Sequence, residues 1–134
     1  IQDSPDEADR VSCRPDAAIL CYPVISAGEH GHVGSFAALL GEKASADQRR
    51  SVSNEHQVTP ETPPCFLWHT ADDKGVPVQN SLLFSEALRR NRVPFELHVF
   101  PTGSHGLGLA EADPVVGQWP ALCATWRATL GFVG

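Results

Sequence analysis

Two turns of this chain carry side chains that could act together in acid–base chemistry. Asp72 and Asp73 follow the apolar run "CFLWH", and Ser104 and His105 follow the apolar run "FELHVF". If both runs are parallel strands of one sheet, both turns open at the same edge of that sheet, where sites form in such folds. A carboxylate there can fix the tautomer of an imidazole, which then transfers a proton. The spacing therefore predicts an Asp–His pair.

A structural interpretation of the same residues stays open. Asp73 could cap the turn or helix that follows it, and His105 could be a surface residue of its turn. Two adjacent carboxylates at the end of a buried strand are costly, because neither charge is well solvated and each raises the pKa of the other. The residue types alone leave both interpretations open.

Three short apolar runs predict the strands that hold these turns. They span residues 17–24, 65–69 and 95–100, and each has the length and composition of a strand. Strands that alternate with helices through short connections indicate right-handed crossovers and a parallel sheet covered on both faces. The fold class predicted from this pattern is α/β.

Two longer amphipathic segments predict the helices that cover the sheet. The segment 78–93 predicts a helix of about three turns, with Leu83 and Ala87 one turn apart on a face. The segment "QWPALCATWRATLGF" predicts a second helix, which begins through Pro120 and ends at Gly131. Both helices follow a strand directly, as the α/β pattern requires.

The segment 26–64, between the first two strands, is long for a crossover connection. It contains "GSFAALLG" and "SADQRRSV", the latter with a capping-box pattern from Ser45 to Gln48, and we expect two short helices there. Such an excursion at the carboxyl end of a strand often shapes a binding site, although a surface elaboration without function is equally common.

Three parallel strands make a poor independent sheet, and the first sixteen residues are polar and turn-rich and supply no further strand. We therefore expect residues 1–134 to form a single partial domain, incomplete in this chain, with an exposed strand edge on its N-terminal side. That edge could mediate self-association or association with the missing N-terminal half.

The composition excludes several classes of partner. The chain has 134 residues, 42% of them hydrophobic, and a formal net charge of -6. A chain of this kind folds into one globular domain, and without an extended basic patch we expect no nucleic-acid partner. The apolar stretches are too short for a membrane span and no secretory signal is evident, so we expect a soluble chain of unknown compartment.

The remaining histidines and the cysteines offer no metal site. His30 and His32 lie near Glu29, but no further ligand completes a set, and the four cysteines form no C-x-x-C pair. We therefore expect no metal. His69 is predicted to end its strand and support the acid turn, and His98 to be a packed or hydrogen-bonded strand residue.

The stretches "HTADDKGVPVQNSLLFSEAL" and "FPTGSHGLG" carry the pattern of a known family. Together with "RPDAAILCYPVIS" and "HVGSFAALLG", they resemble the C-terminal half of an α/β-hydrolase over nearly the whole chain. The resemblance is closest to the esterase branch that contains acetyl xylan esterases, and less close to the catalytic domain of prolyl oligopeptidase. It implies that Asp73 is the triad acid, with Asp72 its neighbour, and that His105 is the general base.

This sequence departs from the family pattern at the nucleophile. The family places its serine on a G-x-S-x-G turn, and neither Ser35 in "VGSFA" nor Ser104 in "TGSHG" satisfies that motif. The expected position of the serine, and of the oxyanion-hole loop, is therefore upstream of Ile1.

The resemblance implies a carboxylic ester hydrolase that removes acetyl groups from a carbohydrate such as acetylated xylan. A small-molecule or carbohydrate ester is the expected substrate, and the Ser-His-Asp mechanism needs no cofactor. Two alternatives remain: a serine peptidase of the oligopeptidase type, and a non-catalytic fragment or binding domain that lacks the nucleophile.

Overall fold

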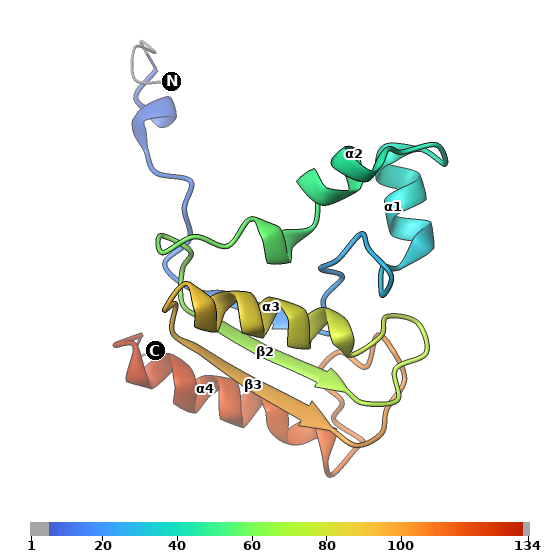
Figure 1. Cartoon of the computed structure of the whole chain (residues 1–134). Coiled ribbons are helices and arrows are strands. Elements are labelled where there is room, and N and C mark those ends of the chain that lie inside the picture. The colour runs from blue at the N-terminus through green and yellow to red at the C-terminus, as the bar shows by residue number, and fades with distance from the viewer. Residues whose placement is uncertain (1–5, 133–134) are drawn as a thin grey trace.

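A computed structural model describes residues 6–132 of the chain, and its centre is a three-stranded parallel sheet (Figure 1). The strands are β1 (Ala18–Cys21), β2 (Cys65–Thr70) and β3 (Phe95–Phe100), in the spatial order β1-β2-β3. Both pairings are parallel, with Cys65 opposite Ala18 on one side and Phe95 on the other. The predicted α/β class is confirmed, while β1 is shorter than predicted because the backbone leaves the extended conformation at Tyr22.

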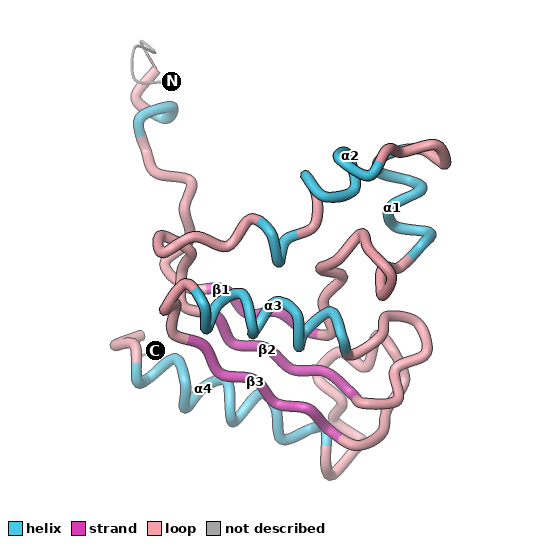
Figure 2. Tube along the Cα trace, viewed as in Figure 1, coloured by secondary structure: helices cyan, strands magenta, loops and turns pink. Residues whose placement is uncertain are grey.

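The two long helices cover opposite faces of the sheet, as Figure 2 shows. They are α3 (Gln79–Arg90) and α4 (Trp119–Thr129), and α4 has Pro120 in its first turn as predicted. The buried face of α3 is formed by Phe84, Ala87 and Leu88, whereas Leu83 is 36% exposed. The predicted pairing of Leu83 with Ala87 on one face is therefore only half right, since helical spacing gives the angle between residues but not the side that meets the sheet.

The central strand β2 divides the core into two parts, because successive side chains point to opposite faces. Phe66 and Trp68 pack with Trp126 on the α4 side. Cys65 and Leu67 pack on the α3 side with the buried face of that helix. All six residues of β2 are buried, as expected for the central strand of a sheet that is covered on both faces.

The segment between β1 and β2 contains α1 (Val33–Leu40), α2 (Ala46–Ser51) and the 3₁₀ helix η2 (Asn54–His56). Two further 3₁₀ helices are η1 (Ala8–Arg10), near the start of the described residues, and η3 (Val116–Gln118), directly before α4. The capping box is confirmed, since Gln48 N donates to Ser45 Oγ and Ser45 N donates to Gln48 Oε1. The two short helices predicted in this segment are also present.

The fully buried Asn80 of α3 forms hydrogen bonds with the start of the segment between β1 and β2. Its Oδ1 accepts hydrogen bonds from Ile25 N at 2.9 Å and Ser26 N at 3.0 Å, and its Nδ2 donates to His30 O at 2.8 Å. The chain that leaves β1 is thereby held beside the carboxyl ends of the strands. Within residues 6–132, every helix is too short or too polar to cross a bilayer.

Candidate active site

Asp73 and His105 are hydrogen-bonded across the carboxyl ends of β2 and β3. His105 Nδ1 lies 2.8 Å from Asp73 Oδ2. The carboxylate can only accept, so Nδ1 carries a proton, and in the neutral form of the imidazole the lone pair is on Nε2. The Asp73 side chain is fully buried, whereas the His105 side chain is 39% exposed. The structure therefore brings the two predicted residues together, with the basic nitrogen of the imidazole free to meet a substrate.

The two carboxylate oxygens of Asp73 have different hydrogen-bond partners. Oδ1 accepts from Gly75 N at 2.8 Å and from Val76 N at 2.9 Å, which closes the turn after β2, and Oδ2 meets His105. The turn-capping interpretation of Asp73 is thus correct as well. Burial acts to raise the pKa of the carboxyl, but the hydrogen bonds from Val76, His105 and Gly75 outweigh it, and the pKa of Asp73 lies below its usual value. Asp73 is therefore a carboxylate at neutral pH.

His69 lies behind the acid and supports the turn, as predicted. Its Nε2 is 2.9 Å from Val76 O and 3.4 Å from Asp73 Oδ2. A carbonyl only accepts, so Nε2 carries the proton, and Nδ1 accepts from the Ser81 hydroxyl at 2.8 Å. Burial lowers the pKa of His69, against the hydrogen bond to Val76 and the charge of Asp73. A neutral His69 adds a donor beside Asp73 without forming an ion pair that would compete with His105.

Asp72 has a different task from its neighbour, which the sequence did not indicate. Its Oδ1 accepts from Gly103 N at 2.8 Å, and Thr70 Oγ1 donates to Gly103 O at 2.8 Å. Two side chains at the end of β2 therefore hold the turn that carries His105, through hydrogen bonds to the N–H and the carbonyl of Gly103. A Cβ at position 103 would lie 2.8 Å from side-chain atoms of both Thr70 and Leu107, so glycine is required there.

A cavity of about 540 Å³ opens in front of the Asp–His pair. It is lined by Asp72, Lys74, Gly75, Gly103, Ser104 and His105. A Cβ on Gly75 would lie 3.1 Å from His105 Cβ, so the acid turn and the histidine turn approach each other as closely as a glycine allows. The volume is in the range of a small-ligand site.

No serine hydroxyl among residues 6–132 forms a hydrogen bond with His105. Ser104 lines the cavity beside His105, and Ser35 is bonded to His32 Nδ1 at 2.9 Å in the first turn of α1. His32 accepts from Ser35 N and so caps α1, a role that the sequence did not indicate because histidine is not a preferred N-cap residue. In this part of the chain, no three His, Cys, Asp or Glu side chains are grouped to hold a metal ion. His98 is hydrogen-bonded to Glu96 and packs near Phe66, as predicted.

Comparison with known proteins places this arrangement among hydrolases. The model of the prolyl oligopeptidase family matches residues 32–118. An acetyl ester-xyloside bifunctional hydrolase from Caldicellulosiruptor lactoaceticus, known from a crystal structure, is 51% identical, with a TM-score of 0.97 over 100% of this chain and 49% of its own.

Two curated proteins are also similar to this chain. Endo-1,4-beta-xylanase B of Butyrivibrio fibrisolvens is 47% identical over 82% of this chain. Acetylxylan esterase of Xylanibacter ruminicola is 34% identical over 71% of this chain. The chain spans only 17% and 21% of the length of these two relatives. The predicted resemblance to acetyl xylan esterases of the α/β-hydrolase superfamily is confirmed by these matches.

Proposed function

The chain belongs to the prolyl oligopeptidase family, and we propose that it supplies the acid and the base of a serine esterase that deacetylates a carbohydrate such as xylan. The observation that carries the proposal is the hydrogen bond between Asp73 and His105 at the mouth of a cavity. The similarity to an acetyl ester-xyloside bifunctional hydrolase and to an acetylxylan esterase supports the choice of an acetyl ester.

The geometry fits the proton transfers of ester hydrolysis. His105 Nε2 accepts the proton of the attacking serine hydroxyl as the oxygen adds to the ester carbonyl, and it then returns the proton to the departing sugar oxygen. Asp73 keeps the Nδ1 proton in place and stabilises the imidazolium that forms between these steps. A water molecule, activated by the same nitrogen, releases acetate from the acyl-enzyme and regenerates the serine.

The nucleophile and the oxyanion hole come, in this proposal, from a segment outside the chain. The crystallised relative aligns with all 134 residues over only 49% of its own length, which leaves room for such a segment. Residues 1–134 then form one partial domain, and residues 26–64 are an excursion at the rim of its site.

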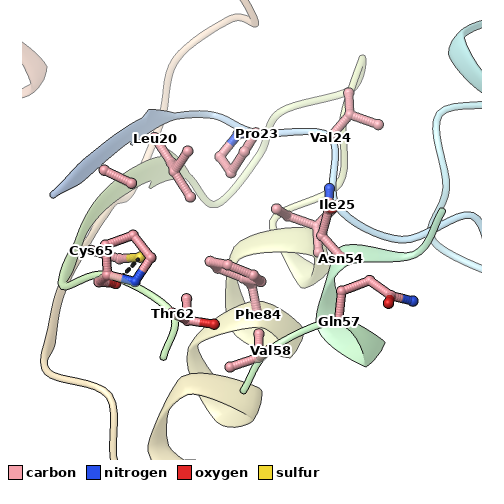
Figure 3. A pocket seen from close by; sticks show the side chains of 12 residues that line it. Leu20, Pro23, Val24, Ile25, Asn54, Gln57, Val58, Thr62, Cys65 and Phe84 are labelled. Carbon is pink, nitrogen blue, oxygen red and sulfur yellow. Dashed lines mark hydrogen bonds between the residues drawn. The ribbon is translucent and has the colours of Figure 1, made fainter. Parts of the chain in front are cut away.

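The free edge of β1 is the proposed place where the remaining sheet joins. Beside it, on the α3 face, lies a cavity of about 370 Å³ with a largely apolar lining (Figure 3). Leu20, Ile25, Val58 and Phe84 are among the side chains that surround it. In a parallel sheet every crossover helix packs on a sheet face beside its own strand. A helix that accompanies a strand on the β1 edge can pack on either face of the sheet, and the apolar lining of this cavity favours the α3 face.

The test begins with the coding sequence that precedes Ile1, which should encode a G-x-S-x-G motif in the same reading frame. The continuous protein should hydrolyse p-nitrophenyl acetate and release acetate from acetylated xylan. The 134-residue chain should be inactive alone and should gain activity when the preceding segment is added in trans. An inactive continuous protein would favour the non-catalytic alternative.

A second candidate activity is peptide hydrolysis, which the family match favours, because prolyl oligopeptidases give the family its name. The same Asp–His pair would serve an amide substrate. Assays of the continuous protein on a succinylated Gly-Pro-p-nitroanilide and on p-nitrophenyl acetate separate the two activities, and we expect hydrolysis of the ester only.

A further inference from the structure

Tyr22, directly after β1, has a backbone conformation that large side chains avoid. Its φ is 39°, in the left-handed region, which costs a non-glycine residue conformational free energy. Among residues 6–132 the other non-glycine residues with positive φ are Arg92 and Ala110, which lie in loops. Strain of this kind persists only where surrounding contacts enforce it, and it concentrates at functional sites.

The contacts of Tyr22 join the hydrophobic core on the α4 side to the turn that carries His105. Its N–H donates to Trp68 O at 2.8 Å and so extends the β1–β2 ladder. Its hydroxyl accepts from Gly108 N at 3.3 Å, in the turn that carries His105. Its ring packs edge-on against Trp68, with centroids 4.9 Å apart, and against His105, with centroids 4.8 Å apart and planes at 68°.

We propose that Tyr22 is a positioning residue for His105, an inference that rests on the proposed esterase function. The hydrogen bond to Asp73 fixes one nitrogen of the imidazole but leaves the ring free to pivot about that bond. Burial does not prevent the pivoting, because the His105 side chain is 39% exposed. The ring of Tyr22 blocks one direction of rotation, and its hydroxyl ties the His105 turn to β1.

The left-handed backbone conformation of Tyr22 determines the direction of its side chain. A residue that continued β1 in the extended conformation would point to one face of the sheet, whereas the left-handed turn directs the Tyr22 ring across the end of β2 toward His105. Each of the three strands thus contributes to the site: β2 and β3 lead to the acid and the base, and β1 leads to the ring that restrains the base.

The first test uses the continuous protein with ¹⁵N-labelled histidine and requires no hydrolysis. NMR would follow the tautomer of His105 and the exchange of its Nδ1 proton with water in wild type, Tyr22→Phe and Tyr22→Leu. We expect Tyr22→Leu to speed the exchange about tenfold or more and to mix the tautomers, since an unrestrained ring opens more often. Tyr22→Phe should keep the tautomer, because the ring contact remains.

A second variant covers the case in which Tyr22→Leu does not fold. Tyr22→Gly also removes the ring, but it relieves the strain at φ 39°, and it should give the same NMR change. A folded Tyr22→Leu or Tyr22→Gly chain with wild-type tautomer and exchange would overturn the proposal.

The second test measures esterase kinetics in the continuous protein. There, Tyr22→Leu should lower kcat about 10- to 100-fold with KM changed less than about threefold, because misplacement of a catalytic group affects the chemical step. An unchanged kcat in an active enzyme would contradict the positioning role. Absence of wild-type activity would refute the proposed function and leave the NMR result to decide the role of Tyr22.

Discussion

Asp73 Oδ2 and His105 Nδ1 lie 2.8 Å apart, although 32 residues separate them in the chain. The contact depends on two neighbouring parallel strands whose carboxyl ends both terminate in tight turns. Asp72 and Thr70 grip one of these turns through Gly103. The pair is therefore a product of the sheet and its two turns together.

Replacement of Asp73 by asparagine should abolish most of the esterase activity of the continuous protein. The amide cannot hold the Nδ1 proton of His105 as a carboxylate does, and we expect kcat to fall by about 10³- to 10⁴-fold. The matched control is Asp72→Asn, which changes the neighbouring carboxylate and should lower kcat by less than about tenfold. If the two variants lost activity equally, the assignment of Asp73 as the acid would be wrong.

Only the family resemblance predicts that Asp73, and not Asp72, pairs with His105. The positions of the turns after two parallel strands predict a carboxylate and an imidazole at one edge of the sheet. The residue types alone do not say which of the two adjacent aspartates faces the histidine. Three-dimensional contacts distinguish them, since Asp73 is buried against His105 and Asp72 accepts a hydrogen bond from a glycine of the opposite turn.

Other features could not be predicted because they depend on tertiary contacts. Nothing in "LCYPV" indicates that Tyr22 adopts a left-handed conformation, since tyrosine ordinarily avoids it. The exposure of Leu83 likewise depends on how α3 is rotated against the sheet, which periodicity does not fix. His69 was correctly expected to support the acid turn, but its tautomer follows from the positions of Val76 O and Ser81 Oγ.

The stability of the chain should fall as the pH falls below about 7, because of His69. Burial lowers the pKa of this histidine, so the unfolded chain binds the proton more tightly than the folded chain. The stabilising contribution is complete above the unfolded pKa of about 6.5 and is lost as the pH falls through the folded pKa. Asp73 should also make the free energy of unfolding fall as the pH falls, but below about pH 4, since the pKa of its carboxyl is also lowered in the folded chain.

Urea unfolding at several pH values, followed by tryptophan fluorescence, would measure this dependence. His69→Gln should remove the decline that begins below about pH 7. It should also lower the free energy of unfolding at pH 7 by about 1–3 kcal/mol, because buried hydrogen bonds are lost. His98→Gln is a control at a half-buried site and should keep the decline. A His69→Gln chain with the wild-type pH profile would show that another group titrates.

Gly75→Ala should damage the site with little effect on the fold. The new methyl group would lie 3.1 Å from His105 Cβ and 3.4 Å from Asp73 Oδ1, so the two turns must move apart by a few tenths of an ångström. We expect kcat of the continuous protein to fall about 10- to 100-fold, with less than about 2 kcal/mol lost in stability. Gly34→Ala is the control, because its methyl group would meet only the His32 side chain, which does not line the cavity of the Asp–His pair. Equal activities of the two variants would contradict the close approach.

The four cysteines should react with alkylating reagents at very different rates. Burial raises the pKa of the Cys65 thiol to about 11, so about one thiol in a thousand is ionised at pH 8. Cys13 is exposed and free. Iodoacetamide labelling followed by mass spectrometry should modify Cys13 first and Cys65 only on unfolding in urea. Rapid labelling of Cys65 in the folded chain would contradict the buried position of β2.

The free edge of β1 can be tested with a single proline. Ala18 N and Tyr22 N donate to β2 at Pro64 O and Trp68 O, and because donors alternate along a strand, Ile19 N points to the open edge. Ile19→Pro should leave the β1–β2 ladder intact, yet prevent a further strand from pairing there. Size-exclusion chromatography should show less self-association, and reconstitution of activity in trans should fail. Leu20→Pro, which removes a donor directed at β2, should instead lower the free energy of unfolding by about 1–3 kcal/mol, because a buried carbonyl of β2 loses its partner. Reconstitution that survives Ile19→Pro would show that the remaining sheet joins elsewhere.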